Sequence, residues 1–191
     1  MFLKSNHILI FIILIISCQP IELISPVEFD YSKLKKVSIN ANNIVINVKY
    51  NPIFSEQNIE DQLKDNPLKI VKNWASENIT HFGNQNKFLV NILDASILKK
   101  EIENFSTNKY EEKTIYQYEV FILVEYELYN DDDYLLANTT VETSRSTTSK
   151  KYISINETEM IINDLLIKAL RDFTNETNVM MKLYMSEYIN N

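Results

Sequence analysis

The sequence predicts an α+β fold: a two-layer sandwich with a mainly antiparallel sheet, helices on one face and the element order β-α-β-β-β-α. Apolar or aromatic side chains occupy all seven even positions from Tyr116 to Leu128, the alternation of a strand with one buried face. Residues 66–79 and 154–184 repeat apolar side chains every three or four positions, as amphipathic helices do. The connections after the first helix are too short for parallel crossovers, which favours antiparallel pairing.

The first strand is expected at residues 37–50, where apolar and polar side chains alternate. An irregularity at Asn42 and Asn43 interrupts this alternation without ending it. The polar residues 51–66 follow as a loop that contains Pro52.

The first helix has clear signals at both ends. Asn66 can cap its first turn and Pro67 suits its first position. Gly83, the only glycine of the chain, is expected to stop the helix in the left-handed conformation. His81 lies beside this end, where the macrodipole favours a partly positive imidazole, so we interpret it as a capping residue. Trp74 lies on the apolar face and is expected in the core, or otherwise as an interface anchor.

Three strands are expected after the helix. Residues 88–98 alternate, with an interruption at 94–96, and the long strand spans 114–129. The run Asp131-Asp132-Asp133 is interpreted as a solvated turn, because it lacks the ligand spacing and the glycine of a calcium-binding loop. Residues 135–150, rich in Thr and Val, then return as the partner of the long strand.

The last helix opens with a capping box in one of two registers. Ser154 can pair with Glu157, or Asn156 with Glu159. An apolar stripe at helical spacing then continues almost to the C-terminus.

The composition excludes several kinds of chemistry. With one glycine in 191 residues, the chain has no glycine-rich phosphate loop, dinucleotide-binding turn or nucleophile elbow. One cysteine excludes an intrachain disulfide and a cysteine-based zinc cluster. A net charge of −7 argues against a nucleic-acid partner, which favours a basic surface. We therefore expect no cofactor, no metal site and no nucleic acid.

The N-terminus is organised like a secretory signal. Lys4 precedes nine consecutive apolar residues, 8–16, which match the apolar region of a signal peptide and fall short of the ~20 residues that span a bilayer. The run ends in Ile15-Ile16-Ser17-Cys18, which resembles the bacterial lipobox. The resemblance implies cleavage before Cys18 and acylation of both its thiol and its new amino group, and two or more chains anchor a protein stably. The alternative is a signal anchor that ends in an ordinary cysteine.

The sequence thus divides into a lipoprotein signal peptide at 1–17, a lipid-anchored tether at 18–36 and a single periplasm-facing α+β domain at 37–191. The tether contains two prolines and lacks periodicity, as an extended linker does. We expect the protein in the bacterial cell envelope, held to the membrane by the lipid on Cys18. Gln19 after the cysteine favours the outer membrane over the inner one.

Few side chains of the domain are candidates for chemistry. The carboxylates of Glu119, Glu125 and Glu127 share one face of the long strand, and paired carboxylates can act as acid and base. We interpret them as an acidic outer face opposite Lys or Arg side chains of a neighbouring strand. Arg145 is expected to pair with Glu125 or Glu127, or otherwise to anchor a partner or an anionic head group. No catalytic residue is expected.

Several short segments resemble a family of small uncharacterised alphaproteobacterial lipoproteins. They are Trp74-Ala75-Ser76-Glu77-Asn78-Ile79 ending in Gly83, Asp94-Ala95-Ser96, Arg145-Ser146 with a following Thr, and Leu170-Arg171-Asp172-Phe173-Thr174-Asn175-Glu176. The likeness is scattered over residues 37–185 and depends on the shared order of the segments. Members of the family have more glycine and arginine than this chain. The resemblance implies the envelope address and supplies no mechanism.

We therefore expect a non-enzymatic, membrane-anchored envelope lipoprotein that binds an envelope protein partner or assists assembly or transport. The alternative is a module that binds lipid or another apolar ligand, with Tyr116, Tyr118 and Tyr126 lining a cleft between sheet and helices. A third hypothesis is a hydrolase with an unmarked site. A filled core with an exposed apolar strip favours the first, and a large apolar cavity favours the second.

The lipid anchor is directly testable. Replacing Cys18 with Ser removes the acylated thiol, so the variant should leave the membrane fraction and stop incorporating labelled palmitate. Cell fractionation and palmitate labelling measure both effects. A Cys18→Ser protein that stays in membranes and still carries palmitate contradicts the lipobox.

Overall fold

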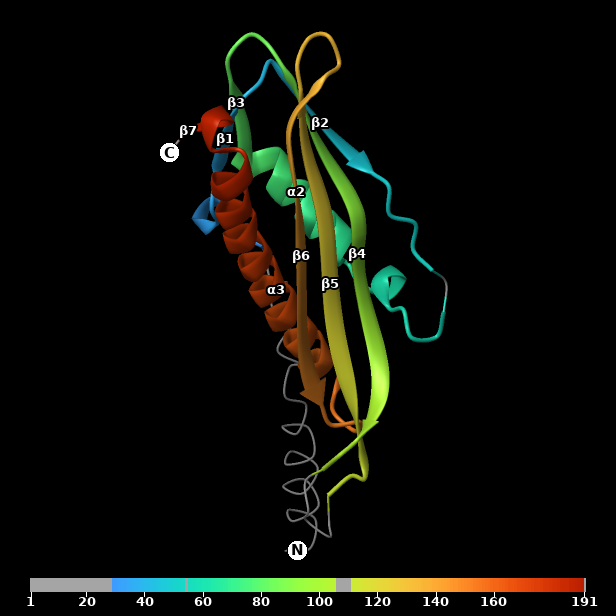
Figure 1. The fold of residues 1–191 in the computed structure, drawn as a ribbon. Helices are drawn as coiled ribbons and strands as arrows, with labels where there is room; N and C mark the ends of the chain where they lie inside the picture. Colours follow the sequence, from blue (N-terminus) through green and yellow to red (C-terminus); the bar gives the residue numbers. More distant parts are fainter. Residues whose placement is uncertain (1–28, 54, 106–110, 191) are drawn as a thin grey trace, which may run out of the picture.

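The structure is a computed structural model that describes residues 29–53, 55–105 and 111–190. The predicted signal peptide and Cys18 lie outside the described residues. Within the described ranges the chain forms two helices and seven strands, arranged in two mixed sheets (Figure 1). The predicted α+β class is therefore confirmed.

The larger sheet has the strand order β2-β4-β5-β6. Its strands are β2 (Asn43–Val48), β4 (Lys87–Glu103), β5 (Thr114–Tyr129) and β6 (Leu135–Ser149). The three long strands pair antiparallel, as predicted, and run along the length of the molecule (Figure 1). Strand β2 instead pairs parallel with β4, because a helical crossover lies between them.

The alternation predicted for β5 is confirmed. The even positions from Tyr118 to Leu128 are at most 2% exposed, and Tyr116 is half-buried. The acidic run 131–133 forms the predicted turn into β6. The side chain of Asn130 holds this turn by accepting hydrogen bonds from the backbone N–H groups of Asp132 (3.0 Å) and Tyr134 (2.8 Å).

The smaller sheet has the order β3-β1-β7, with β1 (Val37–Asn40), β3 (Ile79–Phe82) and β7 (Ile189–Asn190). The strand predicted at 37–50 is therefore two strands in different sheets. The chain passes from one sheet to the other at Ala41, whose N–H donates to Phe82 O at 2.9 Å. Strands β3 and β7 were not predicted, because elements of four and two residues are too short to show an alternation.

The first described helix, α2 (Pro67–Asn78), begins as predicted. Asn66 Oδ1 accepts a hydrogen bond from Lys69 N at 2.9 Å, and Pro67 occupies the first position. The predicted end is wrong, because the chain becomes extended at Ile79 and continues as β3. His81 is therefore an exposed strand residue and caps no helix.

Gly83 has the left-handed backbone that was predicted, at a different place. Its φ is +102°, in the turn between β3 and β4. A Cβ at this position would lie 2.1 Å from Asn40 Oδ1. Both the backbone conformation and the close approach of Asn40 require glycine here.

Strand β4 is continuous where the sequence suggested an interruption. Its register shifts between Ile92 and Asp94, which leaves Leu93 as the extra residue of a β-bulge. The bulge changes which positions face the core. Phe88 and Ile92 are buried before it, whereas Ala95 and Ile97 are buried after it.

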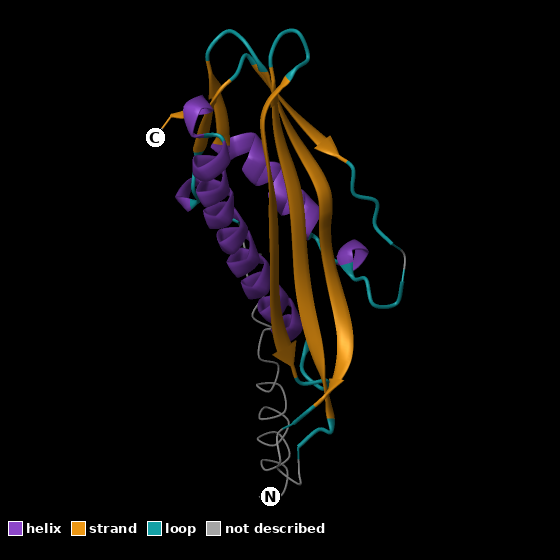
Figure 2. Cartoon of the chain, viewed as in Figure 1, coloured by secondary structure: helices purple, strands orange, loops and turns teal. Residues whose placement is uncertain are grey.

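The long helix α3 (Ile155–Tyr184) uses the first of the two predicted capping registers. Ser154 Oγ accepts from Glu157 N at 3.2 Å, and Glu157 Oε2 accepts from Ser154 N at 2.9 Å. Both helices cover the same face of the larger sheet (Figure 2), and the rings of Trp74 and Phe173 meet edge to face with centroids 5.4 Å apart. Trp74 is thus a core residue, as predicted. Neither described helix is long and apolar enough to cross a membrane.

Two neighbouring substitutions in β5 test this arrangement. Ile122→Asp places an unpaired carboxylate against the helices and should lower the free energy of unfolding by at least about 3 kcal/mol. Phe121→Asp introduces the same charge on the half-buried outer face and should cost about 1 kcal/mol. Urea denaturation of both variants gives the comparison, and equal losses would contradict the assignment of faces.

Candidate functional site

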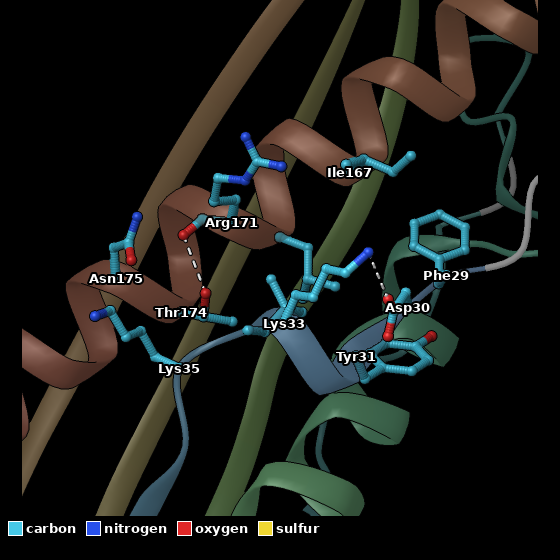
Figure 3. A pocket seen from close by; sticks show the side chains of 11 residues that line it. Phe29, Asp30, Tyr31, Lys33, Lys35, Ile167, Arg171, Thr174 and Asn175 are labelled. Carbon is cyan, nitrogen blue, oxygen red and sulfur yellow. Dashed lines mark hydrogen bonds and ion pairs between the residues drawn. The ribbon is translucent and has the colours of Figure 1, made fainter.

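An open pocket of about 330 Å³ lies between α3 and the segment that leads into the domain (Figure 3). We call it the η1–α3 pocket. The segment contains the short 3-10 helix η1 (Tyr31–Lys33), capped by Asp30, whose carboxylate accepts from Ser32 N at 3.1 Å. The described end of the predicted tether therefore packs on the domain and forms one wall of the pocket.

The walls of the η1–α3 pocket are mainly apolar. Phe29 and Leu34 come from the entering segment and pack against the core. Ile167 and Leu170 come from α3, and Leu170 is buried. The indole Nε1 of Trp74 donates to Lys35 O at 3.2 Å and so fastens the entering segment onto α2.

Two cations at the pocket rim have no partner among the residues that the structure describes. Lys33 forms an ion pair with Asp30 at 3.1 Å; hydrogen bonds from Ser32 and then the neighbouring Lys33 lower the pKa of the Asp30 carboxyl. The Lys35 ammonium and the Arg171 guanidinium, by contrast, contact no hydrogen-bond or ion-pair partner among the described residues. The pocket thus combines apolar walls with two positive charges that no described residue pairs.

The side chains that line the pocket differ along its length. Figure 3 shows Lys35 and Asn175 toward one end, and the Arg171 guanidinium pointing away from the Lys35 ammonium. Phe29 and Tyr31 lie at the other end. Burial raises the pKa of the Tyr31 hydroxyl, so this phenol stays neutral beside the Asp30–Lys33 ion pair.

A second surface feature lies where α3 ends beside the start of β6. Two large apolar side chains there are exposed, Leu136 to 38% and Tyr184 to 56%, and we call this pair the α3–β6 apolar patch. Leu136 and Tyr184 also line a shallow hollow of about 200 Å³. Exposed apolar patches of this kind often mark contacts with other proteins.

The acidic outer face is held by a buried amide. Asn91 is 1% exposed, and its Nδ2 donates to Glu125 Oε2 at 3.1 Å and to Glu127 Oε2 at 2.7 Å. Its Oδ1 accepts from Asn47 Nδ2 at 3.0 Å. Lys49 Nζ lies 3.6 Å from Glu125 Oε2. The structure therefore brings two of the three predicted carboxylates together, and the lysine beside them comes from the residue that follows β2 instead of from a strand next to β5.

The third carboxylate, Glu119, lies apart on the same face. It pairs with Lys100 at 3.2 Å and accepts from Ser144 Oγ at 3.3 Å. Both interactions are of the kind expected for a solvated face. The described residues contain no group of three or more His, Cys, Asp or Glu placed to hold a metal ion.

The pairing predicted for Arg145 is wrong. Arg145 forms an ion pair with Asp172 on α3 instead of with Glu125 or Glu127. The reason is the strand register: Arg145 lies opposite Val120, on the face that looks toward the helices. Side chains on opposite faces of a sheet cannot meet.

Packed side chains fill the space between sheet and helices where the alternative hypothesis predicted a cleft. Tyr118 and Tyr126 are buried, and Tyr126 shares a hydrogen bond of 3.3 Å with Thr177 and stacks on Phe88. Burial raises the pKa of Tyr126, so it stays neutral. Tyr116 is half-buried, with Lys99 Nζ 3.9 Å from its ring centroid. Tyr118 and Tyr126 therefore stabilise the core.

The pocket residues were missed by sequence reasoning. Lys35 was assigned to the tether, and Arg171 was counted only as part of a resembling segment. A cue is present: the basic residues Lys33, Lys35 and Lys36 directly follow Phe29 and Tyr31. That juxtaposition of aromatic and basic side chains becomes a site only because α3 closes over it.

Comparisons with known proteins assign no family. No protein-family model matches the chain, and no curated protein is similar in sequence. Among solved structures, a minor lipoprotein from Acinetobacter baumannii has a TM-score of 0.39 and 8% identity, covering 73% of this chain and 89% of that one. A neuraminyllactose-binding hemagglutinin homologue from Helicobacter pylori has a TM-score of 0.35 and 11% identity, covering 78% and 91%. Similarities of this size carry no argument about function.

The amide at Asn91 is open to a direct test. Asn91→Leu keeps the branching and the number of side-chain heavy atoms but removes the amide that donates to both Glu125 and Glu127, so it should destabilise the protein by roughly 1–3 kcal/mol. Asn138→Leu, an exposed position on β6, should stay within about 0.5 kcal/mol. Chemical denaturation measures both, and a silent Asn91→Leu would show that the network contributes nothing.

Proposed function

We propose that the protein is a lipid-anchored component of the bacterial cell envelope that acts non-enzymatically, by binding. Ligand binding at the η1–α3 pocket is the function that the geometry supports best. The observation that carries it is the combination of apolar walls with Lys35 and Arg171, two cations that pair with no described residue. Apolar pockets with a few placed polar groups are typical of ligand sites.

The position of the pocket in the chain supports the same proposal. Phe29, at the pocket wall, follows Cys18 by 11 residues. A chain of that length spans at most about 40 Å. With Cys18 acylated, the pocket is held within that distance of the membrane, where apolar and amphipathic ligands are concentrated.

Two observations support binding over turnover. Glu125 and Glu127, the acidic pair that could act as acid and base, both accept hydrogen bonds from the buried Asn91 amide. They also lie on the sheet face away from the helices and the pocket. Arg145 is likewise engaged, with Asp172. These side chains have structural partners that explain their presence.

A second candidate function is contact with an envelope protein, which the sequence had favoured. The α3–β6 apolar patch supports it, since aromatic and aliphatic anchors of this kind dominate protein interfaces. Leu136→Glu and Tyr184→Glu would disrupt such a contact and leave the η1–α3 pocket unchanged.

A pair of matched substitutions on α3 tests the proposed function. Ile167→Tyr places a ring at the pocket wall and should abolish complementation of a deletion strain, with the protein still folded and membrane-bound. Val179→Tyr makes the same kind of change at an exposed position of α3 outside the pocket and should complement fully. Complementation, immunoblots of membrane fractions and thermal melts give the three readouts. Full activity of Ile167→Tyr would contradict the pocket as the functional site.

A further inference from the structure

We infer that one end of the domain inserts into the membrane interface and so fixes the orientation of the protein on the bilayer. The inserting side chains are Phe105, Tyr152 and Ile155, which we call the apolar end. This surface is separate from the η1–α3 pocket. The inference rests on the proposed function in one respect, since the lipid on Cys18 is what brings the protein to the membrane.

The apolar end contains the three most exposed large apolar side chains of the described residues. Tyr152 is 86% exposed, Phe105 85% and Ile155 77%. Burying apolar surface away from water is favourable, and apolar side chains gathered at one place on a surface mark a site that a protein or a membrane covers.

Hydrogen bonds join the segments that carry Phe105 and Tyr152. The side chain of Asn104, the residue before Phe105, donates from Nδ2 to Glu112 O at 2.9 Å. The carboxylate of the same Glu112 accepts at 2.7 Å from the backbone N–H of Lys151, the residue before Tyr152. The chain after β4 and the chain after β6 are therefore held next to each other.

The start of α3 lies at the same end of the molecule. Ile155 is the first residue of this helix, and the capping box of Ser154 and Glu157 fixes the turn that presents it. Figure 1 shows the C-terminal ends of β4 and β6 together with the start of α3 at one end of the long sheet. All three apolar side chains thus belong to one end that local hydrogen bonds hold in place.

The chemistry of the apolar end suits a bilayer surface. Tyrosine has an apolar ring with a polar tip and is enriched where membrane meets water. Exposed Lys113 and Lys150 lie beside it, and a lysine stem can follow apolar surface while its ammonium reaches the lipid phosphates. Exposed Glu101 and Glu103 are also there, so we expect burial of apolar side chains, and not lipid charge, to drive insertion.

The opposite end of the molecule does not suit a bilayer. There β5 turns into β6 through the exposed residues Asp131, Asp132 and Asp133 (Figure 1). Three adjacent carboxylates would lose hydration at a membrane surface, which is unfavourable without partners. The contrast between the two ends gives the protein one preferred orientation.

The length of the tether is compatible with this orientation. Phe29 lines the pocket together with Ile167, which lies 12 positions after Ile155 on α3. That separation is about 18 Å along a helix. The 11 residues from Cys18 to Phe29 span at most about 40 Å, so the lipid can enter the bilayer that the apolar end contacts. Insertion would then hold the pocket within about 18 Å of the interface.

Spin labels on the full-length protein, reconstituted in phosphatidylcholine vesicles, test the inference. Asn156→Cys places a label next to the apolar end, and Asp132→Cys places one at the opposite end; both positions are exposed. The protein without an added cysteine is the blank for labelling of Cys18. Nitroxide collisions with oxygen, which concentrates in hydrocarbon, are compared with collisions with a water-soluble nickel chelate. We expect the ratio of oxygen to nickel collisions to be several-fold higher for the label at position 156.

A matched pair of variants shows which side chains insert. Combined Phe105→Ser, Tyr152→Ser and Ile155→Ser should remove the difference between the two labels, because no apolar side chain is left to bury. Combined Ile53→Ser and Tyr134→Ser changes side chains that are 74% and 69% exposed elsewhere, and should preserve the difference. Thermal melts verify that both variants fold.

Equal collision ratios at positions 156 and 132 overturn the inference and leave the apolar end available to a protein partner. A difference that survives the three Ser substitutions also overturns it. Vesicle flotation separates these failures from that of the anchor: a protein that floats with equal ratios keeps its anchor and loses only the insertion, whereas one that does not float loses both. Ligand binding at the η1–α3 pocket is judged independently by the complementation of Ile167→Tyr.

Discussion

The burial of one face of β5 against the two helices is the constraint on which the rest of the structure depends. β5 is paired on both sides, so its register determines the faces of β4 and β6. A slip by one residue would carry Glu125 and Glu127 into the core and expose Val124 and Tyr126. The stacking of Tyr126 on Phe88 and its hydrogen bond to Thr177 then tie this face to β4 and α3.

The bulge in β4 extends this constraint to the edge of the sheet. Past the end of β2, the loop that contains η2 (Glu60–Gln62) covers the edge of β4. Two backbone hydrogen bonds hold it there: Ile59 N donates to Ile97 O, and Lys99 N donates to Gln57 O. The buried Glu60 carboxylate accepts from Tyr50 OH at 2.6 Å and from Ile97 N at 3.2 Å. Burial and this carboxylate raise the pKa of Tyr50, so the phenol remains a donor. The backbone N–H and C=O groups on this edge of β4 are therefore not available to pair with another strand.

The η1–α3 pocket is a by-product of how the helices cover the sheet. Trp74 on α2 contacts Phe173 on α3 and holds the backbone of Lys35, so a single side chain aligns both helices with the entering segment. Arg171 lies beside Asp172, whose ion pair with Arg145 fixes α3 on β6. The residues that hold the backbone of the pocket walls are therefore core and sheet residues, so a small domain can form an open apolar pocket without distorting its core.

The sequence by itself determined the elements whose signals are local. Two-residue alternation located β5, and the caps at Asn66 and Ser154 located the helix starts, because each signal involves residues within one turn or one strand. Arg145 and Gly83 show the limit: their partners, Asp172 and Asn40, lie 27 and 43 positions away. Such contacts depend on strand register and helix placement. Only the tertiary structure decided them, and with them the pocket, because apolar and basic side chains form a site only when distant segments pack together.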